Sequence, residues 1–292
     1  MKKNFILKNH FIIILIIIYF LSDSLLVKTN PIGKSDYFDK NDIEKTQLLH
    51  PEREWERVFY GSSVVAAAYI ESENSYINLG MDYGTIKDVE RLLKNGDIKV
   101  KGELLLGLND ISFYDELPTN KTYINHKKPY EHYLYFNRDR INDILLLSLN
   151  RLLDREEVFP PGYTEQKKEL YFGVLSDEEL EKNNQKMIEL FSFSMDACKE
   201  NFSALESLIS FTEKNDIKLT ALWMPLNPKF EKVPTIIQVM ETANEIFARR
   251  NIKILDWTDS LSPEYFHDTG HLNYETGAPY FTAEVDKLEY KG

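Results

Sequence analysis

The chain has 292 residues, of which 43% are hydrophobic and 28% charged, and its formal net charge is −12. This composition is typical of a globular protein, and we take one large domain as the expectation. The acidic balance and the lack of a dense Lys/Arg stripe exclude a nucleic-acid partner, while the single cysteine, Cys198, excludes an internal disulfide and a multi-cysteine metal site.

The N-terminus carries the first recognisable element. Three lysines within the first eight residues precede an uninterrupted apolar run, Phe11–Leu21, and the apolar character resumes before Val27. The run alone has the length of a signal-peptide core, but extended to Val27 it approaches one membrane span. Because no small-x-small cleavage site follows and the positive charges come first, we expect a single-pass anchor at residues 1–27. Residues 28–54 then form a polar linker, and the rest of the chain lies outside a bacterial cell membrane.

Short apolar runs alternate with amphipathic ones in the rest of the chain, residues 55–292. The predicted strands are 55–61, 75–80, 102–108, 217–226 and 252–257, and the predicted helices follow the first strand, cover 85–97, fall within 233–250 and follow Thr276. A helical insertion is expected at about 111–215, with helices at 141–153 and between Asp177 and Lys214. This alternation predicts an α/β fold, a three-layer α/β/α sandwich with a mostly parallel sheet.

The loops after the predicted strands hold the candidate site, because ligands bind beyond the carboxyl ends of parallel strands. Gly-Ser-Ser at 61–63 follows the first strand, and the last strand leads to Asp268-x-x-His271. A serine hydroxyl needs a histidine to take its proton and a carboxylate to orient that histidine. We therefore expect Ser63 as nucleophile, His271 as base and Asp268 as its orienting acid.

The other two loops supply candidate donors for an oxyanion. Asn109 lies in Gly-x-Asn-Asp after the third strand, and Gly80 and Gly84 follow the second strand. An Asn side-chain amide and backbone N–H groups are suitable donors for a developing negative charge. We expect Asn109, the amide of Ser63 and one glycine amide in this role, and we prefer Gly84 to Gly80.

Each of these patterns has a structural alternative. A Gly-Ser-Ser turn before a helix is commonly an N-cap, in which either Ser62 or Ser63 accepts from first-turn amides. His267 is a competing base and a potential metal ligand, but no third ligand stands at a recognisable spacing, so we expect no metal and no cofactor. The argument for chemistry rests on the combination of the loops.

The order Gly-x-Ser, Asn-x-Gly with a further glycine, Gly-x-Asn-Asp and Asp-x-x-His resembles the four blocks of the SGNH (GDSL-type) hydrolase superfamily. The resemblance covers residues 55–110 and 217–285 and implies a flavodoxin-like sheet, with Ser63, Asp268 and His271 as the catalytic residues. Two features depart from the pattern: Ser62 stands where Asp is usual, and three residues instead of two separate the glycines of the second block. Gly-Ser-Ser with HLNYETGAPYFT is most similar to the membrane-anchored branch that includes the teichoic-acid D-alanylation protein DltD and the alginate O-acetylation proteins.

The expected function is that of an extracytoplasmic serine-dependent acyl-ester enzyme acting on an acylated envelope polymer, such as a polysaccharide or a teichoic-acid-like polymer, or on an acyl donor. Water as acceptor makes it an esterase and a polymer hydroxyl makes it an O-acyltransferase, and the resemblance places transfer slightly ahead. The alternative is a non-catalytic SGNH-fold partner of a membrane-bound O-acyltransferase or a D-alanylation system.

Overall fold

The structure, a computed structural model, describes residues 2–29, 43, 46, 49–52, 54–72, 75–116 and 170–288. The chain divides into two units, residues 1–40 with 126–160 and residues 41–125 with 161–292. In the first unit the described element is α1 (Lys2–Thr29), whose apolar side chains from Phe11 to Leu21 are exposed. Within the described residues, no helix combines the length and the apolarity needed to cross a membrane.

The second unit is an α/β fold. Its strands are β1 (Glu54–Gly61), β2 (Ile77–Gly80), β3 (Lys99–Leu108), β4 (Lys218–Trp223) and β5 (Lys253–Asp256). Its α-helices are α3 (Ser63–Ala68), α4 (Ile86–Lys94), α7 (Asp177–Phe191), α8 (Lys199–Lys214), α9 (Pro234–Arg249) and α10 (Gly277–Asp286). Short 3₁₀ helices are η1 (Asp110–Phe113), η5 (Met195–Cys198) and η6 (Pro263–Tyr265).

All five strands pair in parallel, in the order β2-β1-β3-β4-β5. This is the order of doubly wound, flavodoxin-like sheets, in which the chain winds outward in both directions from β1 and β3. The carboxyl ends of β1 and β3 are therefore adjacent at the point where the winding reverses. Such a switch point is where these folds bind ligands, and it brings the loops after Gly61 and Leu108 together.

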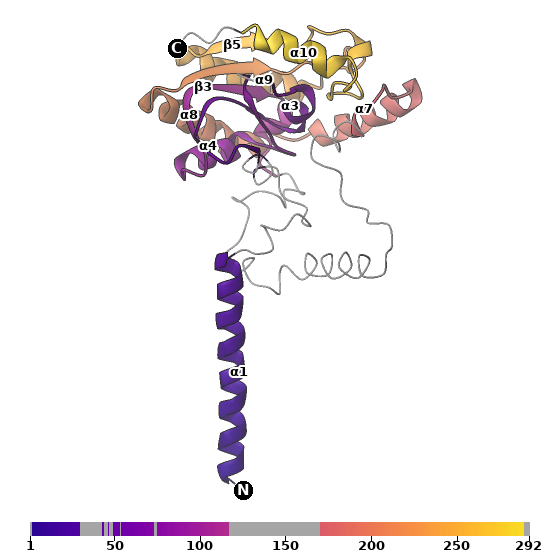
Figure 1. Cartoon of the computed structure of the whole chain (residues 1–292). Helices are drawn as coiled ribbons and strands as arrows, with labels where there is room; N and C mark the ends of the chain where they lie inside the picture. The colour runs from indigo at the N-terminus through magenta and orange to yellow at the C-terminus, as the bar shows by residue number, and fades with distance from the viewer. Residues whose placement is uncertain are drawn as a thin grey trace. The chain divides into compact units, whose positions relative to one another are not determined.

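Helices cover both faces of the sheet. Because successive strand residues point to opposite faces, each strand contributes side chains to the core on either side. In β3, Leu104 and Leu106 pack into the core under α4, α8 and α9, whereas Leu105 packs into the core under α3 and α10. Figure 1 shows α8 and α10 on opposite sides of the strands. The runs of β-branched and leucine residues in the strands are thus explained by burial on two faces.

The sequence placed the five strands and the helices α3, α4, α9 and α10 close to their observed bounds, whereas the long helical stretch expected from Asp177 to Lys214 is divided into α7, η5 and α8. The helical insertion is the exception, because α8 connects β3 to β4 and packs against α4 as a regular crossover helix. Among the described residues of the region expected as an insertion, α7 is the α-helix that lies outside the regular alternation of strands and helices. The helix expected at 141–153 and most of the expected linker, 28–54, lie outside the described residues.

Candidate active site

The turn between β1 and α3 separates the roles of its two serines. Ser62 is buried and is the N-cap of α3, where its Oγ accepts from Val64 N at 3.4 Å. Ser63 is the first residue of the helix, and its Oγ lies 3.0 Å from His271 Nε2. The capping alternative is therefore correct for Ser62, while Ser63 remains available for chemistry.

Glycines at the strand ends let α3 lie directly on the backbone of the sheet. A Cβ atom added to Gly61 or to Gly107 would stand 2.3 Å from Val65 Cγ2, and one added to Gly80 would stand 2.2 Å from the Ala66 amide nitrogen. Contacts this short do not occur between real atoms, so these positions require the absence of a side chain. The glycines of the motifs thus set the position of α3, and with it the position of Ser63.

One loop after β5 provides both the base and the acid. His271 Nδ1 lies 2.9 Å and 3.1 Å from the two carboxylate oxygens of Asp268, and Asp268 Oδ1 also accepts from the amides of Gly270 and His271, at 2.9 Å and 2.7 Å. With the Nδ1 proton directed to Asp268, the neutral ring leaves Nε2 to accept from Ser63 Oγ. The three residues form a continuous hydrogen-bonded series.

Asp268 is held as a carboxylate in this loop. Burial disfavours its charged form, but attraction to His271 together with the hydrogen bonds from His271 and Gly270 outweighs burial and lowers the pKa of Asp268 to about 2. The side chain is therefore ionised throughout the neutral range. A fixed negative charge at this place orients the imidazole and stabilises its protonated form.

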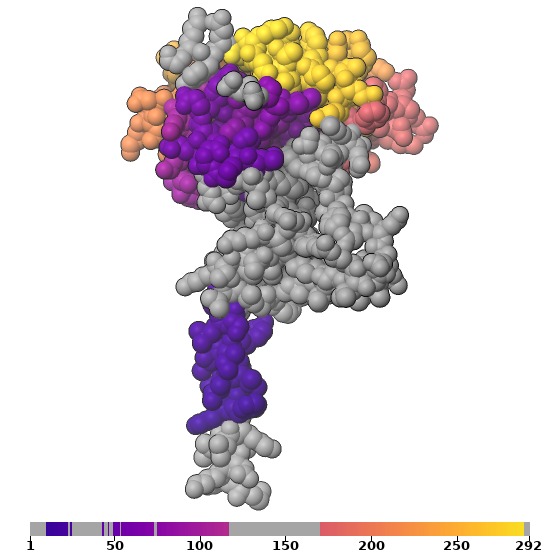
Figure 2. All heavy atoms as spheres, viewed as in Figure 1, coloured from indigo at the N-terminus to yellow at the C-terminus, as the bar shows by residue number. Residues whose placement is uncertain are grey.

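Segments remote in the sequence hold the loop in place. The Tyr171 ring stacks on the His271 ring with centroids 4.4 Å apart and an interplanar angle of 19°. Thr269 Oγ1 lies 2.7 Å from Asn184 Oδ1 in α7, and the Thr269 carbonyl accepts from Asn227 N at 3.0 Å. In Figure 2 the purple segment near α3 adjoins the yellow C-terminal segment, consistent with the packing of α3 against α10. The catalytic loop is therefore fixed from several sides.

Asn109 lines the same pocket as Ser63. Its Oδ1 accepts from the Ser112 hydroxyl at 2.8 Å and from the Ser112 amide at 3.2 Å, which caps η1 and fixes the plane of the side-chain amide. Neither Asn109 Nδ2 nor the Ser63 amide has a hydrogen-bond partner among the described residues. These two groups are the available donors for an oxyanion on a carbonyl attacked by Ser63.

The two glycines expected to complete this set do not reach the pocket. The Gly84 amide donates to the Met81 carbonyl at 2.8 Å, and the Gly80 amide donates to Asn78 Oδ1 at 2.9 Å. Both N–H groups are used in local turn structure, and neither residue lines the pocket. The expectation of a Gly84 or Gly80 donor is therefore wrong in this structure, because the turn after β2 closes on itself.

The competing histidine and the cysteine have other roles. His267 Nδ1 lies 3.1 Å from the Gly173 carbonyl, so His267 braces the loop and does not face Ser63. The described residues contain no cluster of three or more potential metal ligands. Cys198 is buried at the start of α8, and burial raises the pKa of its thiol to about 12, which keeps it uncharged and unreactive.

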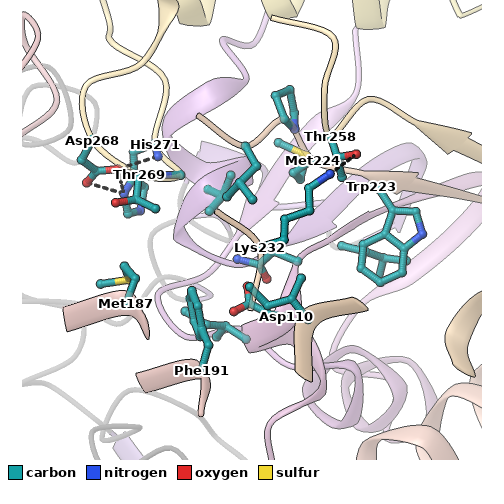
Figure 3. A pocket seen from close by; sticks show the side chains of 18 of the residues that line it. Asp110, Met187, Phe191, Trp223, Met224, Lys232, Thr258, Asp268, Thr269 and His271 are labelled. Carbon is teal, nitrogen blue, oxygen red and sulfur yellow. Dashed lines mark hydrogen bonds and ion pairs between the residues drawn. The ribbon is translucent and has the colours of Figure 1, made fainter. Parts of the chain in front are cut away.

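A pocket that is open to solvent extends from the hydrogen-bonded triad of Ser63, His271 and Asp268. Asp268 and His271 lie at one side of it in Figure 3, and Trp223 lies at the other. Its apolar wall comes from the ends of β3 and β4 and from η1, α7 and α9: Leu108, Ile111, Met187, Phe191, Trp223, Met224, Leu226, Ile236 and Met240. A mainly apolar cavity with a few convergent polar groups is the usual form of a small-molecule site.

Two ionisable residues, Lys232 and Asp110, lie in the wall between His271 and Trp223 (Figure 3). Lys232 Nζ is neutralised by Asp259, at 3.0 Å, and contacts Thr258 Oγ1 at 3.2 Å. Asp110 is buried, and its Oδ2 has no hydrogen-bond partner among the described residues. Burial, only partly opposed by hydrogen bonds from the backbone amides of Asp110 and Ile111, raises the pKa of Asp110 to about 7.

The sequence matches no known protein family and no curated protein. The candidate site therefore stands on its geometry, in which Ser63, Asn109, Asp268 and His271 all line one pocket, as their positions after the strands predicted. Sequence reasoning missed Tyr171, Lys232 and the α7 wall. No local pattern points to them, because they reach the site from parts of the chain without a recognisable motif, and their proximity arises only on folding.

Proposed function

We propose that this protein is a serine-dependent acyl-ester enzyme with Ser63 as nucleophile, His271 as general base and Asp268 as the orienting acid. The observation that carries the proposal is the hydrogen-bonded series from Ser63 Oγ through His271 to Asp268, with contacts of 3.0 Å and 2.9 Å. A weak nucleophile, a base within its reach and an acid behind the base are the parts that acyl transfer through an acyl-enzyme requires. The resemblance to SGNH hydrolases supports the same assignment.

The chemistry follows from this arrangement. Ser63 Oγ attacks the ester carbonyl while His271 Nε2 takes the hydroxyl proton, and the charge that develops on His271 is stabilised by Asp268. Asn109 Nδ2 and the Ser63 amide donate to the oxyanion. When the carbonyl reforms, the bond to the leaving alcohol breaks and His271 returns the proton to its oxygen, which leaves the acyl group on Ser63.

The acceptor in the second half-reaction is water for an esterase or a hydroxyl group for an O-acyltransferase. We propose transfer to or from a cell-envelope polymer, with the resemblance to the membrane-anchored SGNH branch as its support. The apolar run Phe11–Leu21 and the lysines before it support a location on the outer side of a bacterial membrane. Protease accessibility of the α/β unit in intact cells tests the location independently of the chemistry.

The chemical proposal is tested by labelling the full-length protein with a fluorophosphonate and mapping the modified peptide. We expect a single adduct on Ser63, lost in Ser63→Ala and in His271→Ala. Ser62→Ala is the matched control, because it removes only the helix cap, with a loss of about 1 kcal/mol of stability, and it retains the label. An adduct on another residue contradicts the assignment, and no adduct at all favours the non-catalytic partner.

A further inference from the structure

Part of the apolar wall of the pocket belongs to a third hydrophobic cluster, whereas Leu108, Trp223 and Met224 of the same wall belong to the two cores that flank the sheet. Phe191 of α7 and Ile236 of α9 are 4% and 5% exposed and pack together with Phe230, and Met187, Met240 and Ile111 pack at the edge of the same cluster. The cluster lies beyond the carboxyl ends of β3 and β4. Its side chains enclose the pocket, so the cluster lines an open space that begins at the nucleophile.

The direction of the reaction decides which part of an ester this space receives. His271 protonates the leaving oxygen, so the alcohol departs on the side of His271, whose ring is covered by Tyr171. The acyl part then extends from the carbonyl in the other direction, past the oxyanion donor Asn109. Ile111 follows Asn109 by two residues and belongs to the apolar cluster, which makes the path from Ser63 into the cluster continuous.

Below neutral pH, the polar groups of the wall do not create a net charge that would select an ion. Lys232 is paired with Asp259 outside the pocket. Burial raises the pKa of Asp110 to about 7, so its carboxyl group is mostly uncharged below that pH. The flexible side chains of Met187 and Met240 adapt readily to an unbranched chain, since methionine fills irregular space without fixed shape. These features fit an uncharged hydrocarbon chain.

We propose that the pocket binds the acyl chain of the substrate, and that the group carried on Ser63 is a medium-chain fatty acyl group rather than acetyl. This inference rests on the proposed function, because it assigns the acyl side of the ester bond that Ser63 cleaves. Each methylene removed from water strengthens binding by about fourfold. This binding free energy is gained when the acyl-enzyme forms. The side chains of α7 and α9 therefore determine which chain length the pocket prefers.

The experiment uses two fluorophosphonates with the same leaving group, fluoride, that differ only in the chain on the P–C bond, which is ethyl in one and octyl in the other. The rates at which the two reagents label the full-length protein are compared. The Ser63 Oγ–P bond forms as fluoride leaves, so the alkyl chain occupies the place of the acyl chain. We expect octyl labelling to exceed ethyl labelling by about ten- to a hundredfold, which corresponds to burial of about two to three of the six additional methylenes when the bond to phosphorus forms. p-Nitrophenyl octanoate and acetate give the same comparison for turnover, below the concentration at which either forms micelles.

A matched pair of variants on α9 locates the effect. Ile236→Trp fills the cluster and lowers the octyl-to-ethyl ratio to near one, whereas Ile237→Trp, at a position 45% exposed and outside the pocket, keeps the wild-type ratio. The wild-type ratio alone decides the proposal if Ile236→Trp does not fold. Labelling of Ser63 at equal rates for both chains overturns the acyl-chain pocket and leaves the proposed function intact. If neither reagent labels Ser63, both the acyl-chain pocket and the proposed function are overturned.

The leaving-group side provides a further distinction. Octyl acetate and ethyl acetate differ only in the alcohol, and we expect kcat/KM values within about threefold of each other because the alcohol lies outside the apolar cluster. A preference for octyl acetate combined with no preference on the acyl side assigns the pocket to the alcohol and contradicts the proposal.

Discussion

At the triad end of the pocket, a single loop supplies both the base and its acid, and its geometry is fixed by hydrogen bonds between residues three positions apart. At the other end, the wall is assembled from η1, α7, α9 and the segments after β3 and β4, which meet only through packing. The pairing of Asp268 with His271 is local and polar, whereas the apolar wall is long-range. The contact between Ser63 and His271, which lie 208 residues apart, depends on the fold as the wall does. Short-range geometry thus orients the imidazole, and the whole fold brings it to Ser63 and shapes the pocket.

The two carboxyl groups of the pocket show the same contrast. Asp268 accepts hydrogen bonds from the His271 ring and two backbone amides, which outweigh burial and lower its pKa to about 2. Asp110 is buried with one oxygen unpartnered, and its pKa rises to about 7. Burial alone therefore does not determine the charge of a carboxyl group in this site; its partners do.

The largest expected effect is that of Ser63→Ala at the triad end. We expect removal of the proposed nucleophile to lower kcat/KM for an activated ester by about ten-thousandfold or more, because the variant lacks the hydroxyl that would form the acyl-enzyme. Steady-state hydrolysis measures this, with thermal unfolding of the same variant to show that the fold is retained. Equal turnover by the variant and the wild type rules out the proposed mechanism.

Asp268→Asn is the next largest. The amide cannot accept from His271 Nδ1 and both backbone amides as the carboxylate does, so kcat falls by about a thousandfold to ten-thousandfold. The variant also tests how the lowered pKa of Asp268 contributes to the pH dependence of the stability of the folded state. The lowered pKa of Asp268 stabilises the folded state above pH 3.8, and this contribution is lost as the pH falls toward 2. Acid unfolding of the variant should therefore begin from a lower stability and depend less on pH in that window.

Asn109→Asp separates the two functions of the Asn109 side chain. An Asp oxygen can still accept from Ser112 and cap η1, but the side-chain donor is lost, and we expect kcat to fall by about a hundredfold to a thousandfold with the fold retained. Ser112→Ala is the matched control, since it weakens the cap and leaves the donor in place. If Ser112→Ala loses as much activity as Asn109→Asp, Asn109 acts through local structure and not on the oxyanion.

The smallest effect concerns stability and lies at the apolar end. Because folding raises the pKa of Asp110 from 3.8 to about 7, stability falls as the pH rises across that interval. We expect Asp110→Asn to raise the free energy of unfolding by about 1–3 kcal/mol at pH 8 and to leave it unchanged near pH 4. Asp177→Asn, at an exposed position, is the control and should change stability by less than about 0.5 kcal/mol. A flat pH dependence in the wild type contradicts an unpaired buried Asp110.

The same contrast explains what the sequence could and could not predict. Strands and helices follow from local periodicity, and the pairing of Asp268 with His271 follows from their spacing, so both were accessible. The donor role expected for Gly84 was wrong, because whether an amide points outward depends on the closure of its turn, which spacing does not reveal. Tyr171 and α7 were missed because a stacking ring and an apolar wall have no fixed distance in sequence from the residues they meet.

Val65 packs closely against the backbone of Gly61 and of Gly107, and this contact limits which substitutions the site can accept. A methyl group at either glycine would stand 2.3 Å from Val65 Cγ2, so we expect it to displace α3 and with it Ser63. The walls on α7 and α9 carry no such restriction. Substitutions in these walls can therefore change the preferred acyl chain without changing the proposed reaction. Within one cavity, the residues that carry the proposed chemistry are different from those that set the specificity.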